Sequence, residues 1–85
     1  MKSRKLLEKL NKLVGLGEGA DKEEIKKLRK VLHALKDKQE KLKEKLEETQ
    51  DEEERRKIQQ RLEVIKRQRE KGVDVYKSLK AKRDL

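Results

Sequence analysis

The chain contains no cysteine, no proline, no phenylalanine and no tryptophan. Without cysteine, neither a disulfide nor thiolate chemistry is possible. Apolar residues make up 31% of the 85 residues and charged residues 53%, whereas an average soluble domain is roughly half apolar and a quarter charged. This composition excludes a thick globular core.

Long apolar runs are also missing, because no run exceeds two residues. A membrane-spanning helix needs about 18, and residues 1–14 lack the apolar centre of a secretory signal. We therefore expect a cytoplasmic protein with no membrane span.

Five residue types dominate the chain. Ala, Glu, Lys, Leu and Arg supply 56 of the 85 residues, a bias typical of long helices and coiled coils. The length corresponds to one domain. The sequence therefore predicts an all-α fold class in a single helical domain, 1–85.

Glycines divide this domain. Three of the four lie in the segment Gly15–Gly19, and each costs about 1 kcal/mol relative to alanine inside a helix. We predict an amphipathic N-terminal helix over 1–14, a glycine-rich linker over 15–20 and a long antiparallel helical hairpin over 21–85.

Apolar residues in the predicted hairpin recur alternately every three and four positions, as in a coiled-coil seam. Asp21 and Glu24 have the spacing of a capping box, so the first hairpin helix should span about Lys22 to Glu48. The second should begin near Glu52 after a turn at 49–51, and Gly72 either ends it or only weakens it. The predicted seam consists of Ile25, Leu28, Leu32, Leu35, Leu42, Leu46, Ile58, Leu62 and Ile65.

Facing residues in an antiparallel hairpin have a nearly constant index sum. The seam satisfies this condition around a turn near Gln50, with Leu35 opposite Ile65 and Leu28 opposite Gly72.

The N-terminal helix carries its leucines on one face. That face can dock on the hairpin of the same chain, contact another chain or lie on an anionic membrane. The expected helix-docking or partner face consists of Leu6, Leu7, Leu10, Leu13 and Val31.

Groups for catalysis or metal binding are scarce. The single histidine, His33, has Asp37 one turn away, and a two-helix seam offers no substrate pocket. Zinc needs four ligands, and the acidic residues near the turn lack the calcium-loop pattern. The Gly15-x-Gly17-x-Gly19 run has no preceding strand to make it a dinucleotide motif. We predict no enzyme activity, no catalytic residues, no metal site, no cofactor and no small-molecule substrate.

The net charge of +9 and the pI near 9.8 favour anionic partners. We predict a non-enzymatic protein–protein interaction or assembly module. The alternative is a basic nucleic-acid-associated protein that binds phosphate backbones non-specifically, because one aromatic residue and interleaved carboxylates argue against sequence-specific recognition. The possible anion contacts are Lys2, Arg4, Lys5, Lys9, Lys12, Lys26, Lys27 and Lys30.

Charges of opposite sign occupy opposite ends of the predicted hairpin. Residues 44–54 hold seven acidic side chains and one basic, a net charge of −6, whereas residues 1–14 carry +4 and residues 22–30 carry +3. This segregation favours an antiparallel homodimer that forms a four-helix bundle. A monomer whose lysine stems cover the seam is the alternative.

Overall fold

The computed structural model describes residues 3–83, and within that range it contains helices and no strand. The α-helices are α1 (Ser3–Leu16), α2 (Lys22–Glu48) and α3 (Glu52–Arg83), with a short 3₁₀ helix, η1, at Gly17–Gly19. The predicted all-α class is confirmed.

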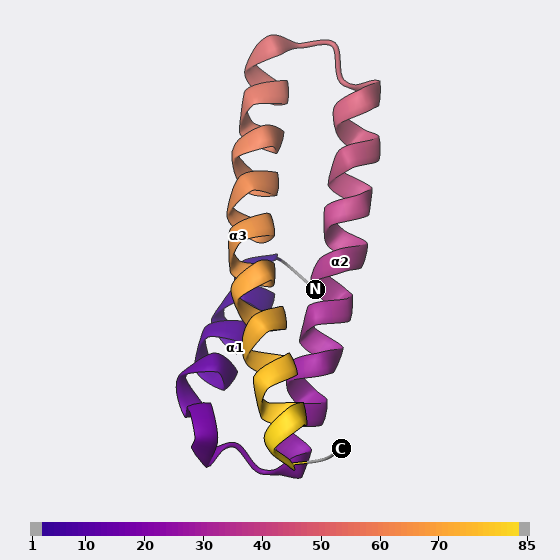
Figure 1. Ribbon diagram of the computed structural model, residues 1–85. Helices are drawn as coiled ribbons and strands as arrows, with labels where there is room; N and C mark the ends of the chain where they lie inside the picture. The colour runs from indigo at the N-terminus through magenta and orange to yellow at the C-terminus, as the bar shows by residue number, and fades with distance from the viewer. Residues whose placement is uncertain (1–2, 84–85) are drawn as a thin grey trace.

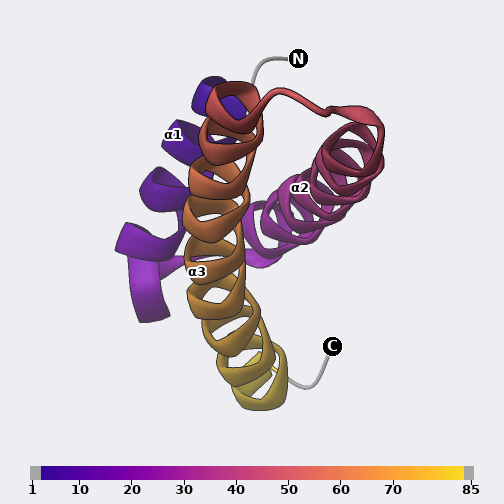
Figure 2. The same ribbon diagram turned by 90° about the horizontal axis from the view of Figure 1, so that it is seen from above.

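The helices form a rod of about 47 × 19 × 18 Å. Helices α2 and α3 lie side by side and antiparallel along its length, and α1 packs against both at one end (Figure 1). Seen from above, the helix axes are inclined to one another (Figure 2). The rod thus has a three-helix part, which we call the base, and a two-helix part, which we call the arm.

Helix α2 has the bounds predicted from the sequence because both of its ends carry capping interactions. Asp21 Oδ1 accepts a hydrogen bond of 2.8 Å from the Glu24 amide, and Glu24 Oε1 accepts one of 3.1 Å from the Asp21 amide. These bonds satisfy two amides that would otherwise lack partners at the helix N-terminus. At the other end, the Thr49 amide and hydroxyl both donate to the Lys45 carbonyl.

The turn between α2 and α3 is held by a side chain from the first turn of α3. Arg55 Nη1 donates to the carbonyl oxygens of Leu46, at 2.6 Å, and Thr49, at 2.9 Å. A basic side chain at these carbonyls satisfies acceptors that the end of α2 leaves open. Asp51 immediately precedes α3, and its Oδ1 accepts a hydrogen bond of 3.2 Å from the Glu53 amide.

Helix α1 ends two residues later than predicted, because Gly15 and Leu16 continue it. The predicted linker at 15–20 is therefore too long, and residues Gly17–Gly19 form a 3₁₀ turn. Gly17 has a φ of +54°, a left-handed conformation that glycine adopts without steric cost. This residue lets the chain leave α1 and turn back toward α2.

Helix α3 does not end at Gly72 but continues to Arg83, so of the two outcomes predicted for Gly72 the first, an end of the helix near Lys71, is wrong. Burying a side chain such as Leu79 contributes roughly 1.5–3 kcal/mol, more than the ~1 kcal/mol that glycine costs a helix. The close neighbours of Gly72 also differ from the prediction. They are the side chains of Leu10 and Leu32, the latter one turn beyond Leu28 on α2.

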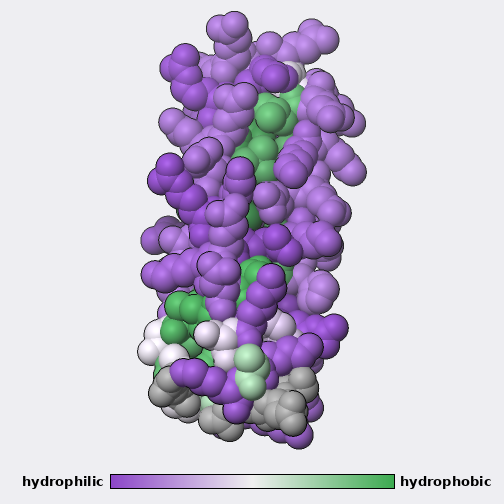
Figure 3. Space-filling model, viewed as in Figure 1, coloured by the Kyte–Doolittle hydropathy of each residue, from purple (hydrophilic) through white to green (hydrophobic). Residues whose placement is uncertain are grey.

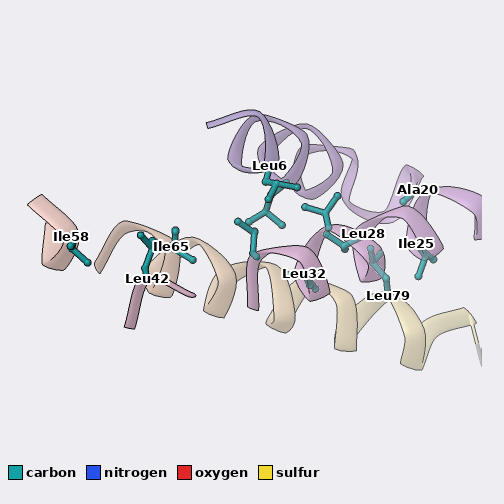
Figure 4. Packing of buried hydrophobic residues seen from close by; sticks show 12 residues of the cluster. Leu6, Ala20, Ile25, Leu28, Leu32, Leu42, Ile58, Ile65 and Leu79 are labelled. Carbon is teal, nitrogen blue, oxygen red and sulfur yellow. The ribbon is translucent and has the colours of Figure 1, made fainter. Parts of the chain in front are cut away.

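The core is a row of aliphatic side chains between α2 and α3, joined at the base by side chains such as Leu6 of α1 (Figure 4). Most of the predicted seam is buried, and only Leu46 and Leu62 are half-buried. On the face seen in Figure 3, apolar surface is confined to a narrow strip between the long helices and a patch near the base. The buried seam residues are Ile25, Leu28, Leu32, Leu35, Leu42, Ile58 and Ile65.

Candidate functional site at the base

An open groove of about 480 Å³ runs between α1 and α2 at the base. Its floor is apolar, with Leu13 half-buried and Val31 buried. Four exposed lysines, two from each helix, form its rim. We call this feature the lysine groove; its lining residues are Lys9, Lys12, Leu13, Lys27, Lys30 and Val31.

Similar local sequences on the two helices explain how the lysines come together. Residues 9–13 read Lys-Leu-Asn-Lys-Leu, and residues 27–31 read Lys-Leu-Arg-Lys-Val. In each segment the second residue, Leu10 or Leu28, is buried, and the lysines three positions apart share one flank of the helix. When the two leucines pack inward, both pairs of lysines and both final apolar residues line the groove. This pairing of similar segments is the sequence signal that could have revealed the groove.

No carboxylate lines the lysine groove. Of the acidic residues near these lysines in the sequence, Glu8 pairs with Arg4 at 3.7 Å, Glu24 belongs to the capping box of α2, and Glu23 stands four positions before Lys27 without lining the groove. Four ammonium groups therefore share one concave surface with no acidic residue in its lining. Such a surface attracts a negatively charged ligand.

A second groove lies on the other flank of α1, against α3. Leu7 and Ile65 contribute its apolar part together with Val64, whose exposed fraction of 48% is large for an aliphatic residue. Lys57 and Arg61 supply positive charge at this groove. Helix α1 is thus bordered on both sides by apolar surface with a basic rim.

The structure separates the predicted partner face into two groups. Leu6, Leu10 and Val31 are buried within the chain, so they form part of the core. Leu7 and Leu13 are half-buried, and each lines one of the two grooves beside α1. Helix α1 therefore docks on its own hairpin while leaving two leucines accessible at its edges.

Of the predicted anion contacts, four gather in the lysine groove, namely Lys9, Lys12, Lys27 and Lys30. Arg4, Lys5 and Lys26 are exposed but do not line it. Lys2 lies outside the described residues.

In the part of the chain that the structure describes, no three His, Cys, Asp or Glu side chains are placed to hold a metal ion. None of the helices in residues 3–83 combines the length and the apolar character needed to cross a bilayer. The chain matches no protein-family model, no curated protein and no solved structure. The case for this candidate site therefore rests on its geometry, an apolar floor with four lysines at its rim.

Proposed function

We propose that the protein is a non-enzymatic helical interaction module whose lysine groove binds an acidic amphipathic helix of a partner protein. The observation that carries this proposal is the combination of Leu13 and Val31 on the groove floor with four lysines at its rim. An amphipathic helix places apolar anchors on one face, and acidic residues beside those anchors would meet the lysines. The apolar contact supplies affinity, and the charges supply orientation and a fast encounter.

The apolar floor favours a protein partner over nucleic acid. Phosphate backbones need positive charge but gain little from an aliphatic surface. Proteins that bind single strands usually stack bases on aromatic side chains, and no aromatic residue lines the lysine groove. Non-specific binding of nucleic acid through the same lysines is the competing proposal.

A second copy of the chain is one partner with the required chemistry. Residues 44–54, which carry a net charge of −6, lie around the free end of the arm, where Leu46 is half-buried. In an antiparallel homodimer this acidic end would lie beside the base of the other copy. The homodimer and the cytoplasmic location stay predictions.

The proposal is tested with a fluorescent synthetic peptide that forms a helix with leucines on one face and glutamates beside them. Its affinity is measured by anisotropy for the wild type and for the double variant Lys27→Glu/Lys30→Glu. We expect the double variant to weaken binding at least about tenfold, because two rim charges are reversed. The matched control, Lys36→Glu/Lys41→Glu, makes the same charge change at exposed sites on α2 and should alter affinity less than about threefold.

A third variant separates protein from nucleic acid as the ligand. Leu13→Gln removes an apolar floor residue and changes no charge, so it should weaken peptide binding and leave binding to generic duplex DNA unchanged. Circular dichroism checks that each variant keeps its helices. The proposal is wrong if the peptide binds both double variants equally well. It is also wrong if duplex DNA binds more tightly than the peptide near physiological salt, with an affinity that falls steeply as salt increases.

A further inference from the structure

A small pocket on the surface between α2 and α3 has an unusual lining, which the interaction function does not use. Its open volume is about 150 Å³, smaller than that of the lysine groove. Two arginines, one from each helix, lie with a histidine and the only tyrosine of the chain around two aliphatic residues. The lining consists of Arg29, Leu32, His33, Arg69, Val73 and Tyr76.

Arg69 is the residue of this pocket whose hydrogen bonding is incomplete. It is half-buried, and its Nε is fully buried without a hydrogen-bond partner in the described chain. Buried polar atoms nearly always have a partner in folded proteins, and an exception calls for a physical explanation. A guanidinium is always charged and has no acceptor of its own, so any partner for Arg69 has to be a hydrogen-bond acceptor.

The pocket contains positive charge without a carboxylate. No acidic residue stands three or four positions from Arg29 or Arg69, so neither helix offers a local partner. Elsewhere in the chain such partners exist, because Arg67 pairs with Glu63 at 3.4 Å. Within residues 3–83, neither Arg29 nor Arg69 forms an ion pair.

We infer that this pocket binds a small oxyanion of the phosphate class. Arg29 and Arg69 come from different helices, and His33 and Tyr76, which also line the pocket, each carry a group that can donate a hydrogen bond. A carboxylate has two oxygens in one plane, whereas a tetrahedral oxyanion presents acceptors toward donors on several sides. Arginine also binds phosphate with paired, charge-assisted hydrogen bonds. The pocket is open to solvent, so the anion can be free phosphate or a phosphomonoester group on a larger molecule.

The site is tested with inorganic phosphate as the probe. Binding to the full chain is measured by isothermal titration calorimetry at constant ionic strength, with chloride replacing phosphate in the reference. We expect Arg69→Gln to weaken binding at least about tenfold, which corresponds to one lost charge-assisted hydrogen bond. Arg29→Gln, at an exposed position, should weaken it similarly without disturbing the core. The control is Arg67→Gln on the same helix, because Arg67 is exposed and lies outside the pocket; it should change affinity less than about twofold.

Further ligands identify the source of the anion. If phenyl phosphate binds as well as inorganic phosphate, the site is assigned to a phosphomonoester group. If phenyl phosphate does not bind, the site is assigned to the free ion. Either outcome keeps the phosphate class. Acetate binding as tightly as phosphate would overturn the inference, as would equal loss of affinity in the Arg67 control. Unchanged phosphate binding in Arg29→Gln would also overturn it, and that variant stays informative if Arg69→Gln fails to fold.

Discussion

At Gly72, a β-carbon would lie 2.7 Å from Leu10 Cδ1 and 2.8 Å from Leu32 Cδ2. The absence of a side chain at this position lets α1 and α2 both approach α3 closely. Gly15 is the opposite case, since it is helical and exposed, and a β-carbon there would meet nothing within 4 Å. The same residue type therefore has a packing role at one position and none at the other.

This contrast predicts opposite results for the same substitution. Gly15→Ala should stabilise the protein by roughly 0.5–1 kcal/mol, because alanine is the better helix former and no atom has to move. Gly72→Ala should not stabilise the protein, because overpacking a filled site costs about 1–3 kcal/mol and offsets the gain in helix propensity. Urea unfolding followed by circular dichroism measures both free energies. Equal stabilisation by the two variants would show that Leu10 and Leu32 do not confine Gly72.

At the scale of the helices, the ends with local chemical signals could be predicted. The bounds of α2 follow from the Asp21 capping box and from the polar residues at 49–51 that interrupt the apolar pattern. The end of α3 could not be predicted in the same way. The local cost of Gly72 is visible in the sequence, but its burial under Leu10 and Leu32 is a property of the packed helices.

The candidate site was predictable in part for the same reason. Charge and helical period identified the basic residues on α1 and α2, but they do not say which of these residues face one another. The lysine groove depends on the inward packing of Leu10 and Leu28, which brings two similar segments together across the helix pair. The pocket lined by Arg29 and Arg69 was not predicted, because a seam position occupied by Arg69 looks in the sequence like a simple interruption of the apolar pattern.

On the scale of the whole molecule, charge and length act together. The acidic residues 44–54 and the basic residues of α1 lie toward opposite ends of a rod 47 Å long. Charges are screened over about 8 Å at physiological salt, so each end presents its own sign to a neighbouring molecule. Val64, 48% exposed, adds an apolar side chain on the surface of α3.

We expect these features to produce an antiparallel dimer of twice the 10.2 kDa monomer mass. Sedimentation equilibrium at tens of micromolar protein should show the dimer at low salt and its weakening at high salt. Glu52→Lys/Glu53→Lys should weaken the dimer, because it places positive charge at the acidic end. The control, Glu70→Lys/Asp74→Lys, makes the same change on α3 beyond the arm and should not weaken it.

The dimer prediction fails if a single monomeric species is present at both salt concentrations. A dimer that strengthens as salt increases would instead contradict the charge-guided orientation.

The connections between the helices also determine the order in which the chain folds. Helices α2 and α3 meet across a three-residue turn, so each contact between them closes a short loop once its neighbour has formed. Leu10 and Gly72 are in contact distance although they stand 62 positions apart in the sequence. Bringing these two residues together costs more conformational entropy before the hairpin has formed than after it. We therefore expect the hairpin to form first and α1 to dock last. Stopped-flow kinetics of Leu10→Ala should show faster unfolding with an unchanged folding rate; slower folding would place α1 in the folding nucleus.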